Sequence, residues 1–133
     1  MNVQTRSPVA GPPETPSNPF VNRVHEIVTE EEFDRLKNHP DNMNVLIVCD
    51  FYATWCNPCV KIAPVLEKWA TGDYRANVVF LKIDVDNNSK LSNFFSIDVL
   101  PTFIFFKRGR QVRHLVGGDV AALKREIDAL KYN

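Results

Sequence analysis

The sequence predicts an α/β fold in which a central mixed β-sheet is sandwiched between helices, in the order β-α-β-α-β-α-β-β-α. Two observations lead to this fold class. Apolar runs typical of buried strands alternate with segments whose apolar residues recur at helical spacing, which is the pattern of strands joined by crossover helices. The last two strands, in contrast, follow each other across a short turn, so an antiparallel hairpin joins the sheet before a final helix.

The first strand and the first helix are expected soon after residue 20. Residues 23–28 are a candidate strand, and a helix is predicted from residue 30 to about residue 38. Thr29 followed three residues later by Glu32 is a capping-box pattern, which places the start of this helix. Residues 40–42, Pro-Asp-Asn, should break it.

The middle of the chain alternates strands and helices. Residues 45–52 are nearly all apolar, as expected for a strand that is covered on both faces. The helix predicted for residues 57–70 contains Pro64, which should kink it. Residues 78–84 form the next strand, and residues 89–95 a short helix.

A hairpin and a helix complete the chain. The two strands of the hairpin are predicted at residues 102–106 and 111–116, and Gly109 in the turn between them is expected to have a positive φ. Asp119 should cap the last helix, whose apolar face carries Leu123, Ile127 and Leu130.

Length and composition restrict the class of protein. A chain of 133 residues has the size of one domain, and we expect a disordered, Pro-rich tail at residues 1–19 before a domain at residues 20–133. The 16 basic and 16 acidic residues balance, which favours neither a nucleic-acid partner nor a membrane surface. With no apolar leader segment before residue 45 and only three cysteines, we expect a cytoplasmic protein.

The most informative local feature is a pair of cysteines two residues apart, Cys56 and Cys59, between a predicted strand and a predicted helix. A thiol at a helix N-terminus lies near backbone N–H groups that lack helical partners, and its reactive thiolate form is favoured there. Pro58 suits the first turn, where its missing N–H costs little. The alternative is a zinc half-site, but zinc needs about four ligands and Cys49 lies within a predicted strand. We therefore expect no metal.

The segment at residues 50–59, Asp-Phe-Tyr-Ala-Thr-Trp-Cys-Asn-Pro-Cys, resembles the thioredoxin family, and the resemblance extends over residues 21–131. The other matching segments are Ile62-Ala63-Pro64, Lys82-Ile83-Asp84-Val85-Asp86, Leu100-Pro101-Thr102, Phe106-Lys107-Arg108-Gly109 and Val116-Gly117. Their order and spacing agree with the family. The resemblance implies the thioredoxin fold and a protein-disulfide reductase that needs no bound cofactor.

The resemblance also implies a role for each site residue. Cys56 would attack a substrate disulfide, and Cys59 would resolve the mixed disulfide, leaving a redox-active Cys56–Cys59 disulfide. Asp50 would accept the proton of Cys59, with a pKa raised by burial and moderated by Lys82; the alternative is that Asp50 only pairs with Lys82. The residues that would line the substrate groove are Trp55, Asn57, Pro58, Leu100, Pro101, Val116 and Gly117.

Three groove residues carry further expectations. Pro101 occupies the cis-proline position of the family, which would bring the backbone of Leu100 against the cysteines; the alternative is that Pro101 only begins a strand. Gly117 would allow a close backbone approach. Trp55 would shield the cysteines and contact partners, or else be an ordinary core residue.

Three positions depart from the usual family pattern. Asn57 stands where Gly is common, Val60 where a basic residue is common, and Tyr52 where many members have Trp. Because residues between the cysteines tune the stability of the thiolate, Asn57 bears on the reduction potential and not on the kind of reaction.

The partners implied by the resemblance are disulfide-containing client proteins, such as peroxiredoxins or ribonucleotide reductase, and thioredoxin reductase as electron donor. We expect a monomer, with no nucleic acid and no membrane as partner. Two other functions fit the same residues: an oxidant or isomerase in an oxidising compartment, and a redox-dependent binding module that uses the Pro-rich tail.

Overall fold

The computed structural model describes residues 18–132, so residues 1–17 of the predicted tail lie outside the described residues. The elements, in chain order, are β1 (Val24–Ile27), α1 (Glu30–Lys37), a short 3-10 helix (Pro40–Asn42), β2 (Leu46–Tyr52), α2 (Asn57–Thr71), β3 (Val78–Asp84), α3 (Ser89–Phe94), β4 (Thr102–Lys107), β5 (Arg110–Val116) and α4 (Val120–Leu130). This order confirms the predicted fold class. Between residues 18 and 132, no helix has the length and apolar character needed to cross a membrane.

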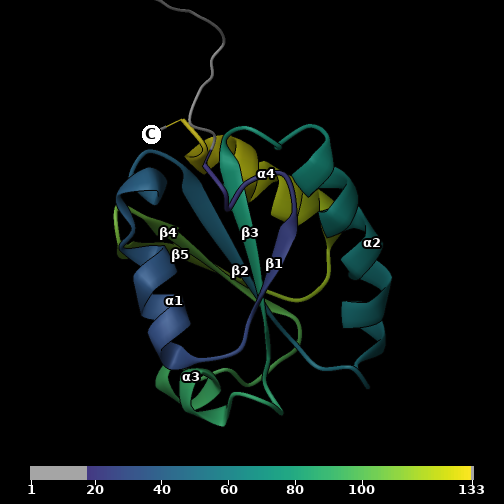
Figure 1. The fold of residues 1–133 in the computed structure, drawn as a ribbon. Coiled ribbons are helices and arrows are strands. Elements are labelled where there is room, and N and C mark those ends of the chain that lie inside the picture. The colour runs from purple at the N-terminus through teal and green to yellow at the C-terminus, as the bar shows by residue number, and fades with distance from the viewer. Residues whose placement is uncertain (1–17, 133) are drawn as a thin grey trace, which may run out of the picture.

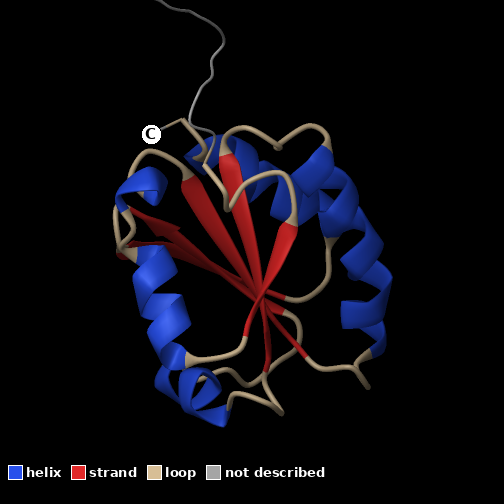
Figure 2. Cartoon of the chain, viewed as in Figure 1, coloured by secondary structure: helices blue, strands red, loops and turns tan. Residues whose placement is uncertain are grey.

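One five-stranded sheet forms the centre of the fold, with the strand order β1-β3-β2-β4-β5. Strands β1 and β2 run parallel to β3, whereas β4 runs antiparallel to both β2 and β5. The sheet is therefore mixed, as predicted. In Figure 1, α1 and α3 lie on one side of this sheet and α2 on the other, and Figure 2 shows the strands enclosed between these helices.

The alternation of side chains along β2 divides the core into two layers. Val48 packs in a cluster with residues of α2 and α4. Ile47 and Cys49 belong to a second cluster, with residues of α1 and α3. Because successive side chains of a strand point to opposite faces, the side chain of Asp50 lies on the face that α2 covers.

Thr29 caps α1, but the predicted capping box is only half formed. The Oγ1 atom of Thr29 accepts a hydrogen bond from the N–H of Glu32 at 3.1 Å. The Glu32 carboxylate does not return to the N–H of Thr29. It accepts from the N–H of Val28 at 2.9 Å and lies 2.9 Å from the ring nitrogen Nε2 of His25. Glu32 thereby ties the helix to β1.

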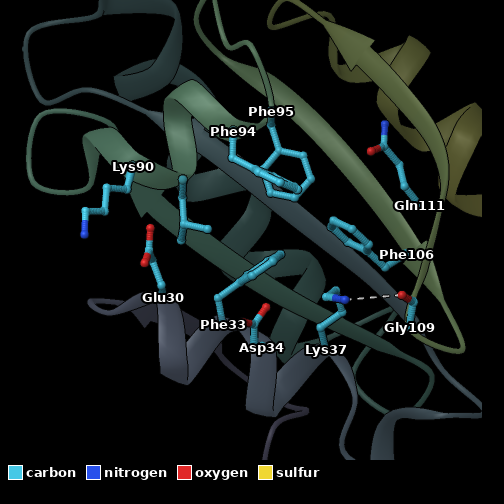
Figure 3. A pocket seen from close by; sticks show the side chains of 11 residues that line it. Glu30, Phe33, Asp34, Lys37, Lys90, Phe94, Phe95, Phe106, Gly109 and Gln111 are labelled. Atoms are coloured by element: carbon cyan, nitrogen blue, oxygen red, sulfur yellow. Dashed lines mark hydrogen bonds between the residues drawn. The ribbon is translucent and has the colours of Figure 1, made fainter.

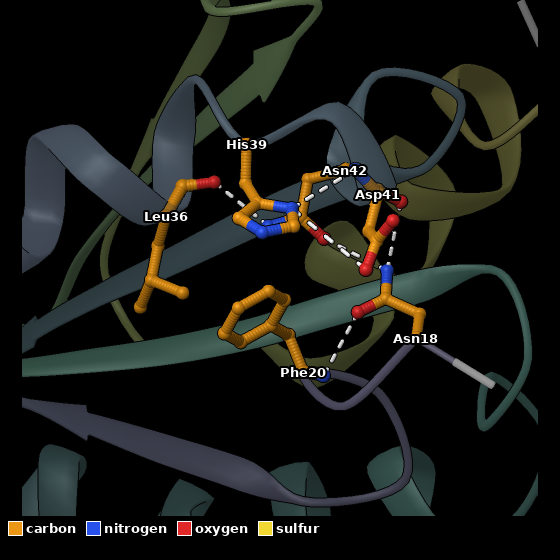
Figure 4. A network of polar contacts seen from close by, with 6 residues as sticks. All are labelled: Asn18, Phe20, Leu36, His39, Asp41 and Asn42. Carbon is orange, nitrogen blue, oxygen red and sulfur yellow. Dashed lines mark hydrogen bonds and ion pairs between the residues drawn. The ribbon is translucent and has the colours of Figure 1, made fainter. Parts of the chain in front are cut away.

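The segment after α1 is held by polar contacts to the start of the described chain (Figure 4). The Asn18 amide donates to the carbonyl of Asp41 at 2.9 Å and to the side-chain oxygen of Asn42 at 2.8 Å. The ring of Phe20 packs edge-on against His39, with centroids 5.2 Å apart. The break predicted at residues 40–42 is thus a fixed 3-10 turn.

Two predictions concern a proline and a glycine. Helix α2 runs through Pro64 as one continuous element, and the kink expected at this proline stays a prediction. In the hairpin, Gly109 has the expected positive φ of 76°, and Arg108 before it has a φ of 51°. This two-residue turn lets Arg110 pair with Lys107, so β5 begins one residue earlier than predicted.

Candidate active site

Cys56 and Cys59 lie at the start of α2 and are joined by a disulfide, with their Cα atoms 5.3 Å apart. Cys56 is the N-cap residue of the helix, and its sulfur accepts a hydrogen bond from the N–H of Cys59 at 3.3 Å. The Cys56 sulfur therefore lies at the positive end of the helix, where negative charge is stabilised. Pro58 occupies the first turn, as predicted.

The surroundings of the two cysteines are mostly apolar. Cys56 is 6% exposed and Cys59 is 3% exposed, so Cys56 is the more accessible of the pair in this oxidised form. Both pack with Ala53, and Tyr52 and Leu100 border this small cluster. The residues on either side of Cys56 in the chain, Trp55 and Asn57, are exposed.

Asp50 is a buried carboxyl on the same face of the sheet as α2. It is 5% exposed, and its Oδ1 atom has no hydrogen-bond partner among the described residues. Burial raises the pKa of Asp50 from 3.8 to about 7, an effect that the charge of Lys82 reduces and that of Glu26 increases. A carboxyl with this pKa can take up and release a proton near neutral pH.

Lys82 lies beside Asp50 in the register of β2 and β3, but its ion pair is with a different carboxylate. Its Nζ atom is 3.7 Å from Oε1 of Glu26, and within residues 18–132 no ion pair joins it to Asp50. The alternative that Asp50 only pairs with Lys82 is therefore wrong. Sequence reasoning missed Glu26. The one feature of the sequence that could have indicated it is the presence of a charged residue within a short predicted strand.

The Leu100–Pro101 peptide bond is cis, as the resemblance implies. Leu100 borders the cysteine cluster. The carbonyl of Pro101 accepts a hydrogen bond from the N–H of Gly117 at 2.8 Å, and Val116 pairs with the residue after Pro101. These contacts bring the start of β4 and the end of β5 to the same edge of the molecule. Strand β4 begins at Thr102, directly after Pro101.

The two glycines after β5 have different roles. Gly117 has a φ of 99°, and a methyl group added to it would meet no other atom within 4 Å. A close approach within the chain is therefore not the reason for glycine here; its backbone conformation is. Gly118, which sequence reasoning did not single out, is the nearer one: an added methyl would lie 3.5 Å from Cβ of Pro58 and 3.8 Å from Cδ of Pro101.

Trp55, the residue before Cys56 in the chain, lies on the surface. It is 69% exposed, so the alternative of a core residue is wrong. Its indole nitrogen donates a hydrogen bond to Oδ2 of Asp86 at 2.8 Å, which links the ring to the segment after β3. Asn57 and Pro58 are exposed next to it.

A pocket of about 490 Å³ lies elsewhere, between α1, α3 and the β4–β5 hairpin (Figure 3). Its apolar lining includes Phe33, Phe94, Phe95 and Phe106, and none of the predicted site residues contributes to it. In the described part of the chain, no cluster of three or more His, Cys, Asp or Glu residues is arranged to hold a metal ion.

Comparison with known proteins agrees with the geometry of the cysteine site. The family model described as thioredoxin matches residues 24–129. The chain belongs to the thioredoxin family. Thioredoxin from Ictalurus punctatus is 42% identical over 93 residues, which are 70% of this chain and 84% of that protein. Thioredoxin-2 from Saccharomyces cerevisiae is 38% identical over 104 residues, which are 78% of this chain and 95% of that protein.

Solved thioredoxin structures have the same fold. A wild-type thioredoxin h from poplar superimposes with a TM-score of 0.74 and 35% identity, covering 81% of this chain and 96% of the poplar chain. Family membership and a cysteine pair at disulfide distance make this chain a thiol–disulfide oxidoreductase and a protein-disulfide reductase. Thioredoxins act on disulfide-containing substrates and are reduced by thioredoxin reductase.

Proposed function

We propose that this thioredoxin reduces client disulfides by dithiol–disulfide exchange, with Cys56 attacking and Cys59 resolving. The supporting observation is the position of the Cys56 sulfur, which caps α2 and accepts the N–H of Cys59. Attack by the Cys56 thiolate forms a mixed disulfide and releases one client sulfur as a thiolate. Cys59 then attacks the Cys56 sulfur, which releases the second client sulfur and leaves the Cys56–Cys59 disulfide. The client gains the two electrons that the cysteine pair loses.

In this proposal Asp50 is the base that accepts the Cys59 proton during the second step, directly or through water. Its burial, its position on the face that α2 covers and its pKa of about 7 support the role. Lys82 moderates the proton affinity of Asp50 through its charge.

The proposed client site is a shallow groove around the cysteines. One side consists of exposed residues of the loop and first turn of α2, and the other is formed by the cis-proline segment and the end of β5. An extended client segment would pair with the backbone of Leu100 in the manner of an added strand. The residues assigned to this groove are Trp55, Asn57, Pro58, Leu100, Pro101, Val116 and Gly117.

The proposed setting is the cytoplasm, where the chain would act as a monomer in electron transport and redox homeostasis. Disulfide-bearing proteins would be its clients, and thioredoxin reductase would be its electron donor. The use of only three cysteines, one of them the buried Cys49, supports a reducing compartment.

Substitution of the resolving cysteine tests the assignment of the two thiols. Cys59→Ser should accumulate mixed disulfides between Cys56 and clients, which mass spectrometry identifies, and should lose turnover in insulin reduction. Cys56→Ser is the matched control and should trap nothing. Equal trapping by the two variants, or trapping by Cys56→Ser alone, contradicts the assignment.

A redox titration of the purified protein against glutathione tests the direction of the reaction. A reductase should have a potential well below that of protein disulfide isomerases. A potential close to that of an isomerase would contradict the proposed transfer of electrons from the cysteine pair to client disulfides.

A further inference from the structure

Three charged side chains lie in one row across the sheet. Glu26 of β1 is the register partner of Lys82 in β3, and Lys82 is the register partner of Asp50 in β2. Register partners on adjacent strands point to the same face of a sheet. Since Asp50 lies on the face covered by α2, the whole row lies there, as a carboxylate, an ammonium group and a second carboxyl.

Lys82, in the middle of this row, is not shared equally between the two carboxyl groups. Its Nζ atom lies 3.7 Å from Oε1 of Glu26, whereas the described residues contain no ion pair between Lys82 and Asp50. The Oδ1 atom of Asp50 is buried, and no group within residues 18–132 forms a hydrogen bond with it. The cation therefore lies on the β1 side of the row.

Tyr52 fixes Glu26 in the position that engages the cation. Its hydroxyl lies 2.8 Å and 2.9 Å from the two carboxylate oxygens of Glu26, to which it donates. The Nζ atom of Lys82 also lies 5.6 Å from the centroid of the Tyr52 ring. The side chain of Glu26 is thus bound to Tyr52 and Lys82 at once.

We propose that Glu26 is a positioning residue for disulfide exchange: it engages Lys82 and so leaves Asp50 as an unpaired carboxyl on the cysteine side of the sheet. This inference rests on the proposed role of Asp50 as the base for Cys59. Without the charge of Glu26, Lys82 is free to turn toward Asp50. A paired carboxylate stays ionised to lower pH and is a weaker base.

Among the described residues, the groups around Asp50 that titrate or carry charge are Glu26 from β1, Cys49 and Tyr52 from β2 itself, Lys82 and Asp84 from β3, and Cys59 from α2. On the β4 side, the register partner of Asp50 is the uncharged Phe103. Tyr52 stays protonated because burial and the Glu26 carboxylate raise its pKa. In the oxidised protein Cys59 is in the disulfide and does not titrate, so the Asp50 carboxyl then responds mainly to Glu26 and Lys82.

The variant Glu26→Gln removes the charge and keeps an oxygen that can accept from Tyr52. The pKa of Asp50 should then fall from its value of about 7. Glu26 and Lys82 are 39% and 33% exposed, so solvent screening should limit the fall to roughly half a unit. The acid limb of the rate of mixed-disulfide release should move down equally, because more of the Asp50 carboxyl is ionised at pH 6. Release at pH 6 should then be faster by up to about threefold, a gain that the weaker basicity of the carboxylate reduces.

Two measurements test this, both with the full chain. Carbon-13 NMR follows the Asp50 carboxyl in the oxidised protein, and stopped-flow kinetics follows mixed-disulfide release against pH. Glu31→Gln, the same charge change at an exposed position of α1, is the matched control and should move neither. In a Lys82→Met background, Glu26→Gln should shift the Asp50 pKa less than half as far, because only the direct charge effect of Glu26 remains and the part that acts through Lys82 is lost. An undiminished shift in that background overturns the inference.

An Asp50 pKa that stays constant or rises in Glu26→Gln overturns the inference, whatever the activity. A lowered pKa with an unchanged rate profile also overturns it, because Asp50 would then not limit release. Neither result affects the cysteine assignment of the proposed function, which the Cys59→Ser trap tests separately.

Discussion

The indole N–H of Trp55 donates a hydrogen bond to the Asp86 carboxylate at 2.8 Å, and so links the loop before α2 to the segment after β3. Both ends of this contact lie at the edge of the sheet where the cysteines are. A ring that is 69% exposed contributes little to the core. Under the proposed function, the fixed orientation of this ring would serve contact with a partner.

Trp55→Phe, which keeps an aromatic ring and removes the N–H, should weaken client binding and leave stability almost unchanged. We expect the KM for insulin reduction to rise about fivefold, as for the loss of one hydrogen bond. The free energy of unfolding should change by less than about 0.5 kcal/mol. Asp86→Asn keeps an acceptor oxygen and should behave almost like the wild type. A fall in kcat at constant KM would contradict a binding role.

Asp50→Asn should stabilise the oxidised protein at high pH. Because the pKa of Asp50 is about 7 in the folded chain and ordinarily 3.8, the folded chain retains a proton between about pH 4 and pH 7 that the unfolded chain releases. The contribution of Asp50 to stability is therefore complete below pH 4 and is lost as the pH rises to 7. Asn cannot ionise, so the variant should exceed the wild type by roughly 4 kcal/mol at pH 8 and hardly at all at pH 4. Urea unfolding at both pH values measures the difference.

Gly117→Ala should destabilise the fold by about 1–3 kcal/mol, because a φ of 99° strains any residue with a Cβ even where space is open. Gly118→Ala is the matched control. Its φ lies outside the left-handed region and its methyl would make ordinary contacts with Pro58 and Pro101, so its cost should be smaller. Urea unfolding measures the free energy of unfolding of both variants. An equal loss of stability would show that the backbone conformation at Gly117 does not cause the destabilisation.

Cys49 should resist alkylation in the folded, reduced protein. It is fully buried in the cluster beneath α1 and α3, and burial together with the charge of Asp50 raises the pKa of its thiol. Iodoacetamide at neutral pH should label Cys56 first and Cys49 only after denaturation, as peptide mass spectrometry would reveal. Labelling of Cys49 at the rate of Cys56 would mean that this layer of the core opens.

Local sequence signals predicted the elements well because the cause of each lies within a few residues. The strand expected at residues 45–52 is Leu46–Tyr52, and the helix expected at residues 57–70 is Asn57–Thr71. A nearly continuous apolar run indicated the strand, and apolar residues at helical spacing, with Pro58 in the first turn, indicated the helix. The one-residue error at the start of β5 comes from the tight turn at Arg108 and Gly109, which sequence patterns do not define to the residue.

Contacts between distant segments could not be predicted in this way. Glu26 gains its importance from the strand order β1-β3-β2, which places it in one row with Lys82 and Asp50, and the sequence did not specify that order. The same holds for Asp86, because no local pattern in the sequence indicates that its carboxylate accepts a hydrogen bond from Trp55. In each case the register between elements, and not the local pattern, decides the partner.

The two bonded sulfurs belong to residues only three positions apart. Closing so small a ring removes little conformational entropy from the unfolded chain, roughly 2 kcal/mol against about 5 kcal/mol for a loop of a hundred residues. The bond is therefore a minor support of the fold. Each cycle of oxidation and reduction changes the covalent connectivity of one helical turn, while the two apolar layers on either side of the sheet keep the molecule folded throughout.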